Sequence, residues 1–154
     1  MRYLKLYKIA KEIDKFNKNK IFINKNKILE LLKNFKPKYV GKGGYKRVFL
    51  VKLNKRELIF KVGRDVKIQY KIYLERKHKK NFKYAKIYWA TEKCLLQKYC
   101  KKVKVPVKLI KANKIIAKKN GYSDWRKDNV GLLNNKIIAF DLQSKEHKQE
   151  RLIK

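Results

Sequence analysis

Acidic residues are scarce in this sequence. It holds 12 Asp and Glu against 45 Lys and Arg, which gives a formal net charge of +33 at pH 7. A surface this cationic attracts polyanions through counterion release and long-range steering. The alternative is a compositional origin, because only seven of the basic residues are Arg, and Lys, Asn, Ile, Tyr and Phe are abundant, as an AT-rich genome produces. With either origin, a polyanion or a partner protein is expected to contact the cationic surface.

Cysteine and histidine are also rare. The two cysteines, Cys94 and Cys100, lie in one apolar stretch without CxxC spacing, and His78 and His147 are isolated. A structural zinc site needs four ligands, usually in closely spaced pairs, so this pattern argues against one. Buried, reduced thiols in a cytoplasmic protein are the expected state.

Long apolar runs are absent. No stretch approaches the ~20 apolar residues that a membrane-spanning helix needs, so no transmembrane segment is predicted. The first 20 residues are basic, but charges interrupt their apolar positions, so they do not resemble a secretory signal. The 154 residues are 44% hydrophobic, which is enough for one folded domain with its own core.

The spacing of apolar residues predicts an α+β fold. Helices are expected at residues 3–16, 27–35, 66–77 and 107–119, with Pro37 closing the second of them. Strands are expected at residues 48–53, 57–62, 85–91, 94–100, 130–133 and 137–140. The first two strands and the last two are each expected to form a hairpin.

Glycines cluster just before the first predicted hairpin. Gly41, Gly43 and Gly44 precede Val48, in the segment that leads into the strand. Because glycine lacks a Cβ atom, backbone N–H groups in such a loop can approach phosphate oxygens. A Walker-type loop, GxxxxGK[ST] opening a helix, is absent. An ordinary tight turn would show the same glycines, so the loop gains meaning only from the residues that follow it.

One lysine interrupts the second strand of that hairpin. Lys61 is flanked by Phe60 and Val62. A lysine of this kind can protect an edge strand from aggregation. It can also hold the phosphates of a nucleotide.

Several of the few acidic residues gather in the last third of the chain. Asp124 and Asn129 stand five residues apart with Asp128 between them, and Asp141 follows an apolar strand. An aspartate can orient and deprotonate an attacking hydroxyl, and the oxygens of Asn129 and Asp141 are ligands that Mg²⁺ prefers. Polar turn residues are the alternative interpretation.

In this order the segments resemble the protein-kinase-like superfamily, over about residues 40–143. The resemblance implies a protein-kinase-like fold, in which an antiparallel N-lobe sheet with a helix precedes a much reduced C-lobe. Residues 38–154 would form a minimal kinase-like domain, and residues 1–37 a helical extension containing two helices.

The resemblance also implies a role for individual residues. Asp124 would be the catalytic base, and Arg126 would steady the phosphate. Asn129 and Asp141 would bind Mg²⁺. The residues expected to contact ATP are Gly41, Gly43, Gly44, Val48, Lys61, Tyr99 and Cys100.

The chain departs from the family pattern in four places. Lys46 replaces the third loop glycine, which adds a cation near the phosphates, and Tyr122-Ser123 replaces the His-Arg before the catalytic aspartate. Asp141 is not followed by the usual glycine two residues later. The helix acid that should pair with Lys61 is Glu75, but the same helix could place Gln69 there instead.

The expected function is transfer of the γ-phosphoryl group from ATP–Mg²⁺ to a hydroxyl of a protein or small molecule. One alternative is an inactive nucleotide-binding pseudokinase or regulatory module, an interpretation that Gln69 beside Lys61 would favour. Another is a basic nucleic-acid-binding protein whose acidic residues are structural.

Overall fold

The computed structural model describes residues 3–18, 23–42, 46–78, 84–101, 107–119, 122–123, 129–133, 136–139 and 143–144. The fold is α+β, as the apolar spacing predicts. The chain forms two compact units. The first comprises Met1–Tyr70 and Lys86–Tyr99, and the second comprises Lys71–Ala85 and Cys100–Lys154.

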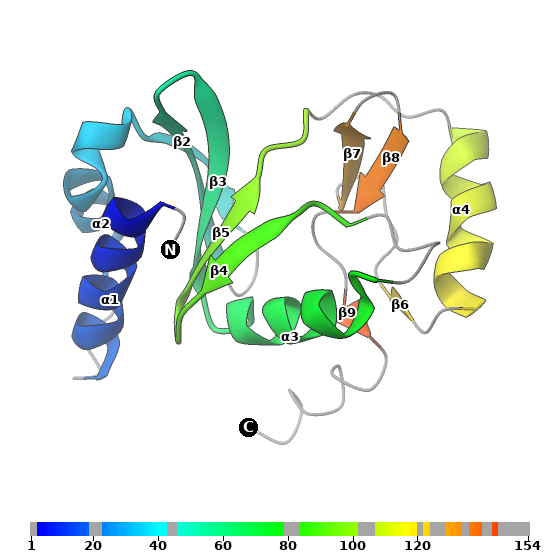
Figure 1. Ribbon diagram of the computed structural model, residues 1–154, viewed down its shortest axis with the longest axis horizontal. Coiled ribbons are helices and arrows are strands. Elements are labelled where there is room, and N and C mark those ends of the chain that lie inside the picture. Colours follow the sequence, from blue (N-terminus) through cyan, green and yellow to red (C-terminus); the bar gives the residue numbers. More distant parts are fainter. Residues whose placement is uncertain are drawn as a thin grey trace. The chain divides into compact units, whose positions relative to one another are not determined.

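The first unit is built on a five-stranded antiparallel sheet with the strand order β1-β2-β3-β5-β4 (Figure 1). Its strands are β1 (Lys38–Lys42), β2 (Lys46–Leu53), β3 (Arg56–Gly63), β4 (Ile87–Ala90) and β5 (Cys94–Lys98). The predicted hairpin of β2 and β3 is confirmed, and it turns at Asn54, whose φ of 56° lies in the left-handed region that asparagine tolerates.

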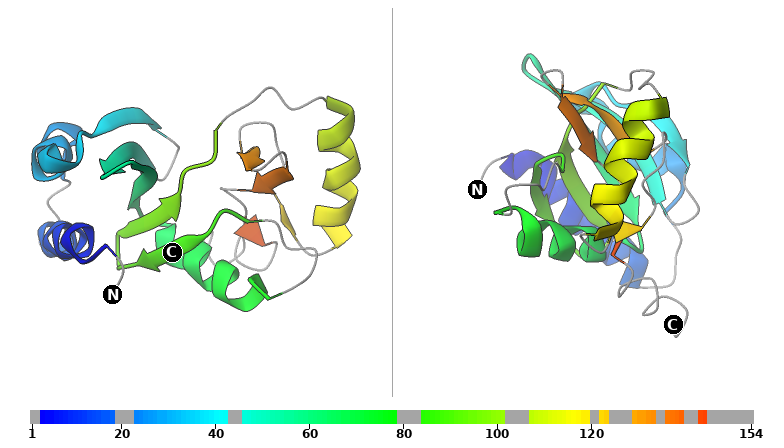
Figure 2. Two further views of the ribbon diagram at one scale, coloured as in Figure 1. Left: turned by 45° about the horizontal axis from the view of Figure 1, so that its top comes forward. Right: turned by 90° about the vertical axis from the view of Figure 1, so that its right-hand side faces the viewer.

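Two helices cover one face of this sheet (Figure 2). They are α1 (Leu4–Lys18) and α2 (Lys25–Leu31), and the latter continues into a 3₁₀ turn, Lys33–Phe35. Alternate residues of the strands face these helices because side chains alternate along a strand. The core between them contains Leu6, Ala10, Ile13, Ile28, Leu32, Phe49, Val51, Leu58, Phe60, Cys94 and Leu96.

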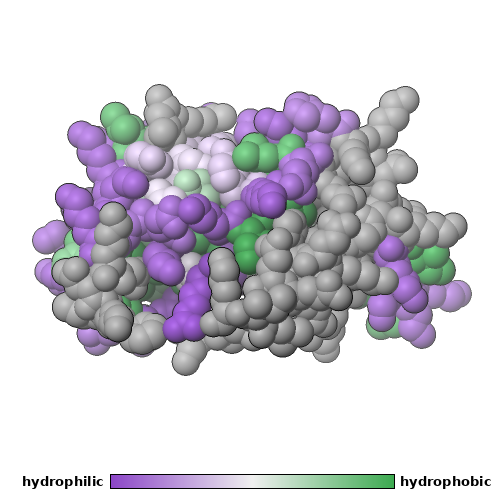
Figure 3. Space-filling view, turned by 90° about the horizontal axis from the view of Figure 1, so that it is seen from below, coloured by the Kyte–Doolittle hydropathy of each residue, from purple (hydrophilic) through white to green (hydrophobic). Residues whose placement is uncertain are grey.

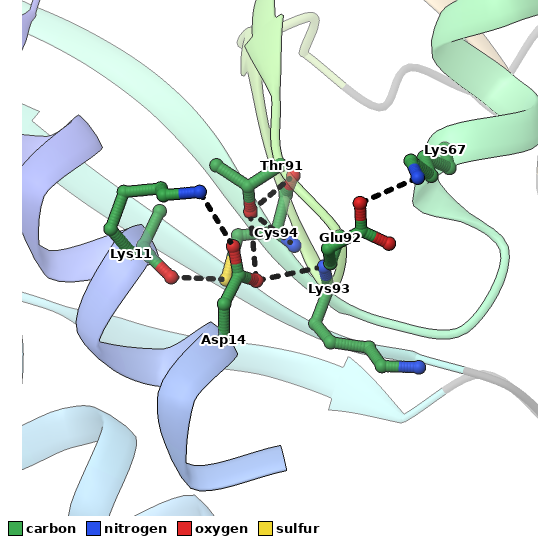
Figure 4. A network of polar contacts seen from close by, with 8 residues as sticks. Lys11, Asp14, Lys67, Thr91, Glu92, Lys93 and Cys94 are labelled. Carbon is green, nitrogen blue, oxygen red and sulfur yellow. Dashed lines mark hydrogen bonds and ion pairs between the residues drawn. The ribbon is translucent and has the colours of Figure 1, made fainter. Parts of the chain in front are cut away.

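A buried carboxylate fastens α1 to the connection between β4 and β5 (Figure 4). Asp14, 5% exposed, accepts hydrogen bonds from Thr91 Oγ1 at 3.0 Å and from the backbone N–H of Lys93 at 2.9 Å. The Cys94 N–H in turn donates to Thr91 Oγ1 at 3.1 Å. The helix is therefore held by polar contacts as well as by apolar packing.

Among its described residues, the second unit contains short paired strands and the whole of the helix α4 (Val107–Lys119). The predicted C-terminal hairpin is confirmed as β7 (Val130–Leu133) and β8 (Lys136–Ala139). An unpredicted pair, β6 (Tyr122–Ser123) with β9 (Gln143–Ser144), is too short to produce a periodic signal. The remaining helix, α3 (Val66–Arg76), begins in the first unit and ends in the second.

The described residues on the face drawn in Figure 3 include many hydrophilic side chains, with smaller apolar patches between them. This polar character agrees with the net charge of +33. Among the helices of the described segments, none combines the length and apolarity that crossing a membrane requires.

Replacing Asp14 by Ala is expected to destabilise the protein by about 2–4 kcal/mol, because two hydrogen bonds to a buried charged group are lost. The measurement is the free energy of unfolding in urea. Glu12, an exposed acid on the same helix, provides the control, and Glu12→Ala should change the stability by less than about 0.5 kcal/mol. Equal losses in the two variants would contradict the anchoring role of Asp14.

Cys94 is expected to make the stability depend on pH. Burial raises the pKa of its thiol well above the usual range, and the nearby Asp14 carboxylate adds to the rise. The unfolded chain ionises this thiol near a pKa of about 8.5 while the native state keeps it neutral, so the stability falls as the pH rises through that value. Ionisation of this thiol in the unfolded chain should lower the free energy of unfolding by about 2 kcal/mol between pH 8 and pH 10.

The matched control for this pH dependence is Cys94→Ala, unfolded in urea at both pH values. It should show a smaller loss between them than the native chain, whatever its stability at pH 8. Identical losses in both proteins would show that the Cys94 thiol does not titrate in this way.

Candidate functional site

Lys61 lies on the middle strand of the sheet in the first unit. Its strand, β3, is flanked by β2 and β5, so Lys61 is not on an edge strand, and protection of an edge does not explain it. Lys61 pairs with Val48 across β2 and with Leu95 across β5. Directly opposite residues of an antiparallel pair share one face, so all three point away from the α1–α2 core. The Lys61 residue is only 3% exposed.

The first turn of α3 supplies the side chain beside Lys61. Lys61 Nζ donates to Gln69 Oε1 at 3.4 Å, and Gln69 is fully buried. Glu75, the other residue considered for this position, is exposed further along the helix. The α3 side chain beside Lys61 is thus a neutral amide, whose interaction with an ammonium group is weaker than that of a carboxylate.

A second buried lysine joins the same group. Lys46 Nζ contacts Asp65 Oδ2 at 2.9 Å, and their side chains are 7% and 3% exposed. The same Asp65 oxygen accepts a hydrogen bond from Gln69 Nε2 at 3.0 Å. Contacts therefore run continuously from Lys46 through Asp65 and Gln69 to Lys61. We call these four residues the two-lysine cluster.

The local fold explains how the four residues meet. Lys46 begins β2 and is paired with Gly63, which ends β3 and adds no side chain to this face. A two-residue turn, Arg64-Asp65, leads directly into α3, which sets its first turn beside the end of the strand. Asp65 and Gln69 are one helical turn apart, and the Gln69 N–H donates to the Asp65 carbonyl at 3.1 Å. Both side chains can therefore reach the same lysines.

The sheet face around the cluster combines charge with apolar surface. Val48, Leu50 and Ile59 lie on the same face as Lys61 and are half-buried. Buried ammonium groups attract anions more strongly than exposed ones, because the surrounding dielectric constant is low. This arrangement suits a ligand that carries both an anionic group and an apolar or aromatic ring.

The glycine loop is described only at its start. Gly41 lies on β1, paired with Val48. A Cβ atom built on Gly41 would meet no atom of the described residues within 4 Å, so the space on that side is open with respect to them. Gly43 and Gly44 lie outside the described residues.

The residues expected at the adenine follow β5. Tyr99 is half-buried and Cys100 is 6% exposed, and the boundary between the two units falls between them.

The predicted catalytic and metal-binding residues fall mostly outside the described part of the chain. Asp124, Arg126 and Asp141 all lie there. Asn129 is described, immediately before β7, and is 9% exposed. Its carboxamide oxygen is a suitable donor for Mg²⁺. Within the described segments, no three His, Cys, Asp or Glu side chains are grouped as a metal site would require.

Sequence reasoning missed Asp65. An aspartate just before a predicted helix is ordinarily interpreted as an N-cap, so its position gave no reason to expect contact with Lys46. The available signal was the four-residue spacing from Asp65 to Gln69, which places both on one side of the first helical turn.

Comparisons of the chain with protein-family models, with curated proteins and with solved structures find no match. The kinase-like interpretation therefore rests on the motifs and on the geometry of the chain itself.

Replacing Asp65 by Ala is expected to destabilise the protein by about 3–5 kcal/mol, because it removes the carboxylate that a buried ammonium group contacts. The matched control is Glu57→Ala, which breaks the exposed pair of Lys52 and Glu57 and should cost less than about 1 kcal/mol. Urea unfolding of both variants tests this difference. A loss of under about 1 kcal/mol for Asp65→Ala would mean that the buried pair contributes no more than a surface pair.

Proposed function

We propose that the protein is a minimal kinase-like phosphotransferase that binds ATP with Mg²⁺ and transfers the γ-phosphoryl group to a hydroxyl of a protein or small molecule. The observation that supports this best is Lys61, a buried lysine on the middle strand, contacted from the first turn of α3. In protein kinases, the lysine of the corresponding strand holds the α- and β-phosphates of the nucleotide.

The surroundings of Lys61 support the same ligand. Val48 is directly opposite Lys61, and the half-buried apolar side chains beside it offer contact area for a base and ribose. The space beside Gly41, open with respect to the described residues, leaves room for a phosphate against the Gly41 backbone. ATP is a ligand with both the anionic and the aromatic part that this face suits.

The chemical step is assigned to the C-terminal motif. Asp124 would orient the hydroxyl and accept its proton, and Arg126 would offset charge on the transferred group. Asn129 and Asp141 are the oxygen ligands proposed for Mg²⁺, which would neutralise charge on the phosphates when bound. The roles proposed for Asp124, Arg126 and Asp141 rest on the spacing of the motif alone. Asn129 is a buried residue whose side chain carries an amide oxygen, a ligand type that Mg²⁺ accepts.

A second candidate function is nucleotide binding without turnover, as in a pseudokinase or regulatory module. The contact of Lys61 with Gln69 favours it, because α3 presents a neutral amide to this lysine where the helix of an active kinase presents an acid. In that case ATP would bind to the first unit without being turned over, and replacing Asp124 would leave ATP binding unchanged.

Mutation of Lys61 and Asp124 separates the two candidates. Lys61→Met should weaken magnesium-dependent ATP binding by about tenfold or more, because one charge-assisted contact with phosphate is lost. Asp124→Asn should leave ATP binding within about twofold and lower hydrolysis or autophosphorylation by roughly 10²-fold or more, the usual contribution of a general base. Titration calorimetry and labelled-phosphate transfer are the measurements.

Lys52→Met is the control, because it removes an exposed lysine from the neighbouring strand β2. It should change neither binding nor turnover. Unchanged ATP binding in Lys61→Met would refute both candidates. If the native chain binds ATP but shows no turnover, the phosphotransferase function is refuted and nucleotide binding without turnover is supported.

A further inference from the structure

We propose that Lys46 is a second phosphate-binding cation, so that the two-lysine cluster holds the phosphate chain of a nucleoside triphosphate with two ammonium groups. This inference rests on the proposed function for the identity of the ligand. It adds a binding residue at a position where the kinase-like pattern has a glycine.

The register of the sheet brings the two lysines together. Lys46 is opposite Gly63, two residues beyond Lys61 on the same strand. The two lysines are thus diagonal neighbours on one face, with backbones about 7–8 Å apart. Their long side chains can converge on one ligand or reach two successive phosphates.

Burial distinguishes these lysines from the rest. Among the residues that the structure describes, Lys46 and Lys61 are the buried lysines, at 9% and 3% exposure. An exposed lysine on this cationic chain needs no special explanation, but burying an ammonium group carries a desolvation penalty. Replacing a buried ion pair by apolar residues is often neutral or stabilising, so stability gives a weak reason for Lys46. An anionic ligand gives a stronger one.

Asp65 shows how two cations are kept together before a ligand arrives. Its carboxylate contacts Lys46 directly and is joined to Lys61 through the Gln69 amide. Within these four side chains, two positive charges face one negative charge. The Lys46 side chain is thereby held on this face in advance, so less conformational freedom is lost when a phosphate binds.

The arrangement predicts a preference for a chain of phosphates over a single phosphate. One phosphate group can satisfy Lys61 alone. A triphosphate carries several charges along its length and can engage Lys46 as well. The contribution of Lys46 should therefore appear with ATP and inorganic tripolyphosphate and be absent with AMP.

The experiment compares the dissociation constants of ATP, AMP and tripolyphosphate by titration calorimetry on the full chain. Lys46→Met should weaken the binding of ATP and tripolyphosphate by roughly tenfold to a hundredfold, the range for one charge-assisted hydrogen bond. Its affinity for AMP should stay within about twofold. Lys46→Arg keeps the positive charge and should recover most of the lost affinity.

Two further variants separate a specific contact of Lys46 from a general effect of charge or of misfolding. With a net charge of +33, some non-specific attraction of polyphosphate is expected. Lys52→Met removes one positive charge from an exposed position of the same strand, β2. The affinities of the Lys52→Met variant for all three ligands should match those of the native chain. The double variant Lys46→Met/Asp65→Asn removes both charges of the buried pair. This double variant leaves no buried carboxylate without its ammonium partner. If Lys46 contacts the phosphate chain, the double variant should lose affinity for ATP and tripolyphosphate and keep its affinity for AMP.

The outcomes are distinct. Unchanged ATP affinity in Lys46→Met, an equal loss for AMP, or an equal loss in Lys52→Met would each overturn the inference. So would a native chain that binds neither ATP nor tripolyphosphate. If the selective loss is found but no phosphoryl group is transferred, the phosphate site stands and the phosphotransferase function fails.

Discussion

The buried pair of Lys46 and Asp65 is the contact on which the polar side of the sheet depends. Two ammonium groups are buried on this face, and taking them out of water is unfavourable unless a carboxylate is close. Asp65, in the turn before α3, provides this carboxylate and forms an ion pair with Lys46. By doing so it also holds the first turn of that helix beside the end of β3. The same interaction therefore shapes both the local fold and the candidate site.

A buried carboxylate also makes polar contacts on the opposite face of the sheet. Asp14 on α1 binds Thr91 and the backbone of Lys93, between β4 and β5. Asp14 and Asp65 are both buried, in a chain that has only 12 acidic residues. Asp14 contacts the sheet from α1, and Asp65 contacts Lys46 of β2 from the turn before α3. With so many lysines available as surface charge, the rare acids matter most where they are buried.

The proposed function gains more support from the middle strand than from the glycine loop. A glycine-rich turn occurs in many proteins, whereas a lysine buried on the middle strand needs a specific reason. The kinase-like pattern has a single pair of a strand lysine and a helix glutamate. Here Lys61 contacts the neutral Gln69, and Lys46 forms an ion pair with Asp65. The negative charge of the cluster comes from the turn before α3, and a neutral amide occupies the helix position beside Lys61. In the proposed function, this difference would affect the rate of phosphoryl transfer more than the binding of a phosphate chain.

By itself, the sequence determined the four helices, most of the longer strands and the residue types of the candidate site, but it did not predict the strands β1, β6 and β9. Periodicity located α1, α3, α4 and both predicted hairpins, because each buries one face along a regular repeat. It also singled out Lys61, whose charge stands out within an apolar strand. Tertiary structure decided the neighbours. That Gln69 contacts Lys61, that Lys46 is buried, and that Asp65 joins them all depend on strand register and on the short turn into α3. These are contacts between segments, and no single-segment pattern encodes them.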